Sequence, residues 1–165
     1  MLSFLKNKKG TPANPNELKA FLSGKVISIE EVKDSVFSSR MLGDGLAIEP
    51  ASELILSPCD GVISIVMEDS KHAVGITAAN GMELLIHEGL DTVALNGEGF
   101  ELYVKPGDKV KAGDKLIKFD AALIKSKGYD ASCILVITNS DEYPNRKLYT
   151  GIEAVAGETV IIEAE

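Results

Sequence analysis

Cysteine, histidine and tryptophan are scarce in this sequence of 165 residues, which has two, two and none of them. Two cysteines alone cannot build a four-ligand zinc cage. Cys59 and Cys133 both lie in apolar, strand-like stretches, LILSPCDGVISI and ASCILVI. We therefore expect them to be free thiols that pack as small hydrophobic side chains in a reducing compartment.

Long apolar runs are also absent. No stretch approaches the roughly 20 apolar residues that a helix needs to cross a bilayer. The opening segment, MLSFLKNKKG, places its lysines after its apolar residues, which is the reverse of a secretory signal. These features predict a cytoplasmic protein.

Basic residues are also few: the sequence has 17 basic and 25 acidic side chains, which gives a net charge of −8. Binding to nucleic acid needs clustered Lys and Arg, so we expect no nucleic-acid partner. An acidic surface suits a basic protein partner instead. The sequence also lacks a Walker-type phosphate loop, a serine nucleophile elbow and a kinase signature. Any phosphoryl group that it carries would have to come from another protein.

Short β-branched runs bounded by Gly, Asp, Asn and Pro are abundant, and they favour strands over helices. Two Gly-Asp steps in KPGDKVKAGDKL indicate tight turns. Only 121–128, which ends at Gly128, and 35–42 have the pattern of short helices. The length suits one domain, and we predict an all-β fold: an antiparallel β-sandwich or barrel with very short helices. The predicted strands are 24–29, 53–58, 61–67, 72–78, 82–87 and 133–139.

Three pairs of similar segments predict that this domain is built from a duplicated motif folded against itself. The pairs are LSGKVISI (22–29) with SPCDGVISI (57–65), GDGLAI (43–48) with GEGFEL (97–102), and VKPGDKVKAGDKLI (104–117) with VAGETVII (155–162).

The polar segment TPANPNE, residues 11–17, contains two prolines and is predicted to be a linker. It separates an N-terminal tail, residues 1–10, from the domain, residues 18–165. The apolar residues of the tail cluster loosely on one side of a helix, and lysines follow them. The tail is therefore either disordered or a short amphipathic helix that makes weak contact with an anionic membrane surface.

The run MELLIH ends on a histidine, His87, which is followed by Glu88 and Gly89. In a strand, Leu85, His87 and Gly89 share one face while Glu88 lies on the other. The run HAVGITA begins at His72, and an antiparallel hairpin through the turn AANG places His72 directly opposite His87. The two imidazoles are then neighbours, within roughly 5 Å at Cβ, and Gly89 leaves room above the ring.

Paired histidines allow four interpretations. They are structural and hydrogen-bonded to the backbone, or they belong to a metal site that needs further ligands such as Asp91 or Glu142. They also suit general acid–base catalysis. In the remaining interpretation, one imidazole nitrogen accepts a phosphoryl group and the other ring donates a hydrogen bond to its oxygens.

From about Leu22 to its C-terminus, the chain resembles the glucose-type enzyme IIA family of the bacterial phosphoenolpyruvate-dependent sugar phosphotransferase system. The resemblance rests on LSGKVISIEEV, DSVFSSRMLGDGLAI, SPCDGV, KHAVGITAANGME, LLIHEGLDTV, LNGEGF, GDKVKAGDKLIKFD and VITNSDE. It implies that residues 18–165 form a IIA domain, a phosphotransferase component that works through a phosphohistidine without a cofactor or a metal.

The resemblance also implies roles for individual residues. His87 is phosphorylated by the histidine-containing phosphocarrier protein and passes the group to a cysteine on the IIB domain of a glucose-type sugar transporter. His72 steadies the phosphoryl group, and Ser70 joins this network. The expected partner-binding residues line an exposed apolar depression with an acidic rim. They are Val36, Phe37, Met41, Leu42, Leu85 and Val93, with Asp34 and Asp91 at the rim.

Glu88 departs from the family, which usually has Val, Ile or Phe at this position. Its carboxylate either repels an incoming phosphate or points to the other strand face. The segment IVMEDSKH is also about one residue longer than usual. Two other functions stay open: a regulatory protein that binds target enzymes and has reduced phosphotransfer, and a lipoyl- or biotinyl-type carrier with Lys71 as the attachment site. The latter leaves His87 unexplained.

Overall fold

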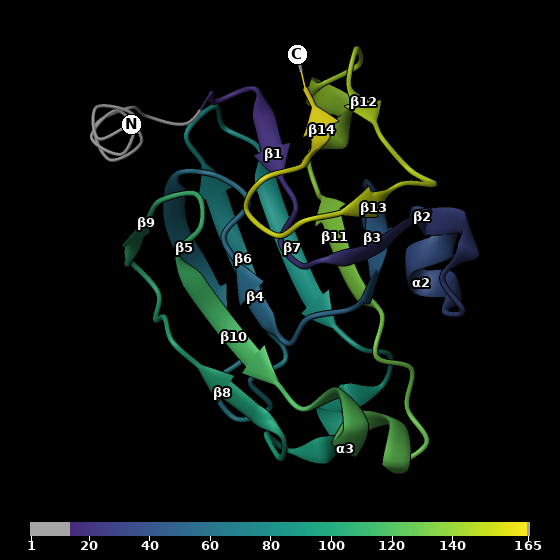
Figure 1. Cartoon of the computed structure of the whole chain (residues 1–165). Helices are drawn as coiled ribbons and strands as arrows, with labels where there is room; N and C mark the ends of the chain where they lie inside the picture. Colours follow the sequence, from purple (N-terminus) through teal and green to yellow (C-terminus); the bar gives the residue numbers. More distant parts are fainter. Residues whose placement is uncertain (1–13, 165) are drawn as a thin grey trace, which may run out of the picture.

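The computed structural model describes residues 14–164 of the chain, which form an antiparallel β-sandwich with short helices (Figure 1). The predicted tail, residues 1–10, lies outside the described residues. The first strands are β1 (Glu17–Lys19), β2 (Gly24–Ser28), β3 (Asp44–Pro50), β4 (Leu54–Leu56), β5 (Gly61–Val66), β6 (Ala73–Ala78) and β7 (Glu83–Glu88). They are followed by β8 (Phe100–Leu102), β9 (Lys109–Val110), β10 (Lys115–Phe119), β11 (Cys133–Ile137), β12 (Lys147–Leu148), β13 (Glu153–Ala154) and β14 (Val160–Glu163). The helices are α2 (Ser35–Ser38) and α3 (Ala121–Ser126), with 3-10 turns η1 (Ile29–Glu31), η2 (Thr92–Leu95) and η3 (Ser140–Glu142).

The predicted all-β class is confirmed, and each of the six predicted strands is present with bounds that differ by at most two residues. The segment predicted as a helix over 35–42 is helical only to Ser38, because Arg40 adopts a left-handed conformation with a φ of 61°. β1 begins at Glu17, which was expected to be the last residue of the linker. Cys59 and Cys133 are free and buried, as expected. Within residues 14–164, no helix has the length and apolar character needed to span a membrane.

Three sheets make up the sandwich. The large sheet has the order β13-β2-β3-β11-β7-β6-β5-β9, and the two small sheets have the orders β1-β14-β12 and β4-β10-β8. In Figure 1 the small sheets lie over one face of the large sheet, and the main core fills the space between them. On the other face, η1 and α2 cover β2, β3 and β11 and enclose a second, smaller core.

The order of strands in the large sheet shows that the motif is duplicated. From one edge of the sheet to its middle the strands are β13-β2-β3-β11, and from the other edge to the middle they are the matching series β9-β5-β6-β7. The two halves meet where β11 pairs with β7. The registers agree: Gly24 pairs with Pro50 on β3 as Gly61 pairs with Ala78 on β6. The small sheets repeat the same relation, each with a bulge at the equivalent place.

Two of the three similar segment pairs predicted from the sequence follow this symmetry, since β2 matches β5 and β14 matches β10. The third pair does not. GDGLAI forms β3 of the large sheet, whereas GEGFEL leads into β8 of a small sheet, and the equivalent of β3 is β6. The two segments share a glycine-rich approach to a strand, but they are not equivalent positions of the duplicated fold.

Candidate functional site

The two histidines adjoin each other on the outer face of the large sheet, with ring centroids 4.6 Å apart and a T-shaped arrangement. The predicted register is wrong by one residue, because Ala73 and not His72 lies opposite His87. Gly81 has a φ of 97° and adds a third residue to the turn. His72 precedes β6, and its carbonyl oxygen accepts a hydrogen bond of 2.8 Å from the N–H of Glu88.

The hydrogen bond made by His87 fixes which of its nitrogens is free. Its Nδ1 lies 2.9 Å from the carbonyl oxygen of Gly89, which can only accept. The proton of the neutral ring therefore resides on Nδ1, and the lone pair is on Nε2. Within residues 14–164, no hydrogen bond occupies Nε2, and the ring is half-buried. His87 thus presents a nucleophilic nitrogen.

Ser70 and His72 form the second part of the site. The Oγ of Ser70 lies 2.7 Å from Nδ1 of His72, and both side chains are buried. When the serine hydroxyl donates to Nδ1, the proton of the neutral ring sits on Nε2. Because the rings adjoin, this N–H is placed to donate to an oxygen of a group held on His87.

Both rings are neutral at neutral pH. Burial, together with a smaller contribution from the neighbouring His87, lowers the pKa of His72 from its ordinary 6.5 to about 4. Burial also lowers the pKa of His87, although the Gly89 carbonyl and the charges of Asp34 and Asp91 oppose this shift. A neutral imidazole keeps the lone pair that a nucleophile needs.

Gly89 has a different role from the one expected. Its φ is 80°, and an added Cβ would lie 2.4 Å from a side-chain carbon of Thr92 and 3.1 Å from the carbonyl oxygen of Asp130. Glycine is therefore required for the left-handed turn and the close approach to Thr92, and not for space above the ring. That turn places the carbonyl which orients His87.

An apolar depression adjoins the histidines on the side of β5 and β6. The residues that line it are Ile65, Met67, His72, Ala73, Val74, Leu85 and His87. Ile65 and Met67 are 54% and 42% exposed. Strict alternation along GVISIVM places Ile65 on the buried face with Ile63, so sequence reasoning missed it. A bulge between Ile63 and Ile65 turns Ile65 outwards, and Gly75 opposite provides the room.

Four of the apolar residues expected to bind partners are exposed at the surface. They are Val36, Met41, Leu42 and Val93. Leu85 is half-buried beside His87 and lines the depression. Phe37 was expected at this surface too, but it is only 5% exposed and belongs to the second core. Its ring centroid lies 5.1 Å from that of His87, so the Phe37 ring packs beside this imidazole.

The two acidic residues expected at the rim also have local structural positions. Asp34 caps α2 by accepting a hydrogen bond of 3.0 Å from the N–H of Val36. Asp91 is exposed in a left-handed conformation before η2. Neither carboxylate has an ion-pair partner within residues 14–164. Both carboxylates therefore keep a charge that a basic partner can neutralise.

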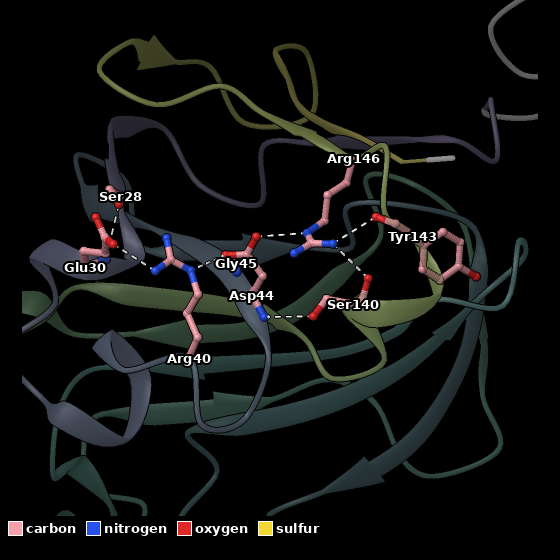
Figure 2. Close-up of polar contacts among 8 residues, drawn as sticks. All are labelled: Ser28, Glu30, Arg40, Asp44, Gly45, Ser140, Tyr143 and Arg146. Carbon is pink, nitrogen blue, oxygen red and sulfur yellow. Dashed lines mark hydrogen bonds and ion pairs between the residues drawn. The ribbon is translucent and has the colours of Figure 1, made fainter.

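A network of two arginines holds the loop that carries Met41 and Leu42 (Figure 2). Asp44 accepts hydrogen bonds of 2.9 Å from Nε of Arg40 and from Nε of Arg146. Burial alone would raise the pKa of Asp44, but the two guanidinium groups outweigh it and hold this pKa below 3.8. The network ties the end of α2 to the segment after η3.

Glu88 lies on the face opposite to His87, as alternation predicts, and its side chain is fully buried. Its carboxyl group therefore points away from a phosphoryl group on His87. Lys71, the attachment site in the lipoyl-type alternative, lies in a left-handed turn before His72. Asp91 and Glu142 do not join the histidines: within residues 14–164 no three His, Cys, Asp or Glu side chains are grouped to hold a metal ion.

A β-sandwich that presents one free imidazole nitrogen beside a second imidazole, within an exposed apolar surface, has the features of a protein that carries a phosphoryl group between partners. The comparison with known families shows which class this is. Residues 16–143 match the model of the phosphoenolpyruvate-dependent sugar phosphotransferase system, EIIA 1, and the chain belongs to this family. It is a phosphoryl carrier of that system, a phosphotransferase that acts through phosphohistidine.

Individual relatives agree with this assignment. The glucose-specific EIIA component of Bacillus cereus is 47% identical over 154 residues, which cover 93% of each chain. That of Haemophilus influenzae is 42% identical and covers 88% of this chain and 87% of its own. Among solved structures, glucose permease IIA from Mycoplasma capricolum superimposes with a TM-score of 0.77 at 38% identity, covering 88% of this chain and 94% of its own. This family is not one of lipoyl- or biotinyl-type carriers.

Proposed function

We propose that His87 accepts a phosphoryl group from the histidine-containing phosphocarrier protein and passes it to the IIB domain of a glucose-type sugar transporter, in the cytoplasm. The observation that carries this proposal is the hydrogen bond from Nδ1 of His87 to Gly89, because it leaves Nε2 with a free lone pair. The names of the relatives support glucose as the sugar.

The transfer step needs no group beyond the two proteins. The Nε2 lone pair of His87 attacks phosphorus while the bond from phosphorus to the donor imidazole nitrogen breaks and leaves its electron pair on the donor. His72 donates its Nε2–H to a phosphoryl oxygen, and Ser70 fixes that tautomer. The low pKa of His72 keeps this ring a neutral donor throughout. Transfer onwards to a cysteine thiolate repeats the exchange with His87 as the leaving group.

Two partners must reach His87 in turn, so they share one surface. It consists of the apolar residues on both sides of the ring, with Val36, Met41 and Leu42 on one side and Ile65 and Met67 on the other. Burying such residues drives association through the hydrophobic effect. Asp34 and Asp91 beside this surface favour a basic donor protein.

Labelling with phosphoenolpyruvate and the two general phosphotransferase proteins tests the assignment of roles. The wild-type protein is expected to take up an acid-labile, alkali-stable label, and His87→Gln is expected to take up none. His72→Gln is expected to accept the label but to transfer it slowly to a IIB domain, since Nε2 of His87 stays free. If His72→Gln blocked acceptance and His87→Gln did not, the roles would be reversed.

The regulatory alternative rested on Glu88, whose charge could have opposed phosphate. Its side chain lies on the inner face of the sheet, away from the lone pair of His87. Direct contact between this carboxylate and a phosphoryl group is therefore not a reason to favour a carrier that has lost transfer. Both histidines are in place, which favours the active carrier.

A further inference from the structure

Glu88 is a fully buried carboxyl group in the main core, one residue after the reactive histidine. Neither of its oxygens has a hydrogen-bond partner within residues 14–164. Its cross-strand neighbour is Cys133, whose thiol is a weak donor. Such a group is unusual, because buried charges are almost always paired.

The internal symmetry shows that the fold does not need a carboxyl group here. Cys133 pairs with Glu88 across the central ladder as Ile137 pairs with Leu84. The symmetry equivalent of Glu88 is therefore Ile137, an apolar side chain with no exposure. An apolar residue fits this place in the other half, so the acid at position 88 is specific to the half that carries His87.

The surroundings favour the protonated form of Glu88. Burial raises its pKa well above 4.5; the thiol of Cys133 partly offsets this rise, and the charge of the exposed Asp130 makes a smaller upward contribution. His72, His87 and Asp91 lie beyond the strand on the outer side, and no cation faces the carboxyl group among these neighbours. An unpaired carboxylate in such a place loses its hydration without compensation, so the group holds a proton instead.

Glu88 is tied to the phosphorylation site through its backbone. Its N–H donates to the carbonyl oxygen of His72, and its own carbonyl oxygen accepts a hydrogen bond of 2.5 Å from the hydroxyl of Thr92. Thr92 is packed against Gly89, whose carbonyl orients His87. A change in the charge of Glu88 therefore acts on the residues that hold both imidazoles.

We propose that Glu88 is a positioning residue that couples phosphorylation of His87 to pH: it stays protonated while His87 carries a phosphoryl group, and its ionisation opposes acceptance of that group. The proposal rests on the proposed role of His87. The coupling is reciprocal, so phosphorylation must also make Glu88 harder to ionise by the same factor. Two unit charges about 10 Å apart in an effective dielectric constant of about 20 change an equilibrium constant more than tenfold.

The test is the equilibrium constant for phosphoryl exchange with the phosphocarrier protein, measured from pH 6.5 to 9.5. Glu88→Gln keeps the shape but cannot ionise, and Glu88→Ile copies the symmetry equivalent. Relative to both variants, the wild-type constant is expected to fall at least tenfold as Glu88 loses its proton. The pH dependence of the donor is common to all three proteins and cancels in the ratio.

A ¹³C NMR titration of the Glu88 side-chain carboxyl carbon provides a second readout that does not require transfer. The carbon is expected to titrate well above pH 4.5, and at a higher pH in the phosphorylated protein than in the free protein. Parallel exchange profiles for wild type and Glu88→Gln, or a carboxyl group already ionised at pH 6.5, would overturn the coupling. A wild-type protein that takes no label at any pH would instead refute the role of His87.

Discussion

Phe37 provides a direct test of the second core. Its side chain is 5% exposed, it is the buried residue of α2, and it packs with the apolar residues of η1, β3 and β11. Replacing a buried Phe with Ala costs about 3–5 kcal/mol. Because α2 has four residues and can settle towards the gap, we expect Phe37→Ala to lose about 3 kcal/mol of unfolding free energy.

Urea denaturation followed by circular dichroism measures this loss. With a slope of about 1–3 kcal/mol per molar urea, the midpoint is expected to fall by about 1 M or more. The matched control is Val36→Ala in the same helix, since Val36 is 41% exposed and its truncation should change stability by less than about 0.5 kcal/mol. If Phe37→Ala unfolded like Val36→Ala and weakened only partner binding, Phe37 would belong to the docking surface and the second core would be wrongly assigned.

Three further predictions concern charged and titratable groups. The unfolded chain loses the proton of Glu88 near pH 4.5, whereas the folded protein keeps it. As the pH rises from 4.5 towards the raised folded pKa, the unfolding free energy of the wild type should therefore fall by about 1.4 kcal/mol per pH unit relative to that of Glu88→Gln. Urea unfolding of both proteins at pH 5 and 7 measures this difference. His72 has the opposite effect on the pH dependence of stability. Its pKa is lowered in the folded protein, so its contribution to the unfolding free energy falls as the pH drops from 6.5 to about 4. An NMR titration of its ring with an inflection near 6.5 would contradict the low pKa. Asp44→Asn should cost about 1–3 kcal/mol and weaken binding of the phosphocarrier protein, because the negative charge between Arg40 and Arg146 is removed and one of them loses its acceptor oxygen. Unchanged affinity in titration calorimetry would separate this network from docking.

The sequence predicts strands well in this protein because most of them are short β-branched runs that end at glycine or a turn. It fails where one residue in an unusual conformation shifts a register. Gly81 adds a residue to the turn between β6 and β7, so His72 is displaced by one position from the partner that alternation gives it. The rings still adjoin: His72 lies before β6, next to the left-handed Lys71, and so is outside the regular alternation of the strand.

The apolar surface is harder to predict because long-range contacts decide it. The bulge that exposes Ile65 depends on Gly75 in the facing strand. Phe37 lies in a four-residue helix with too few positions to show a periodic pattern, so only its packing places it inside. The burial of Glu88 was within reach of the sequence, since alternation alone places it on the face opposite to His87.

The duplicated fold explains why only one of two equivalent positions is accessible. The symmetry equivalents of His72 and His87 are Asp44 and Val136. In the first half, the connection between β2 and β3 carries η1 and α2 and buries Val136 in the second core. In the second half, the connection between β5 and β6 is the short segment 67–72, and His87 stays half-exposed. β7, which carries His87, and its equivalent β11 are both regular strands. The site is therefore accessible because no helix within residues 14–164 covers this part of the second half, and not because the strand has a special geometry.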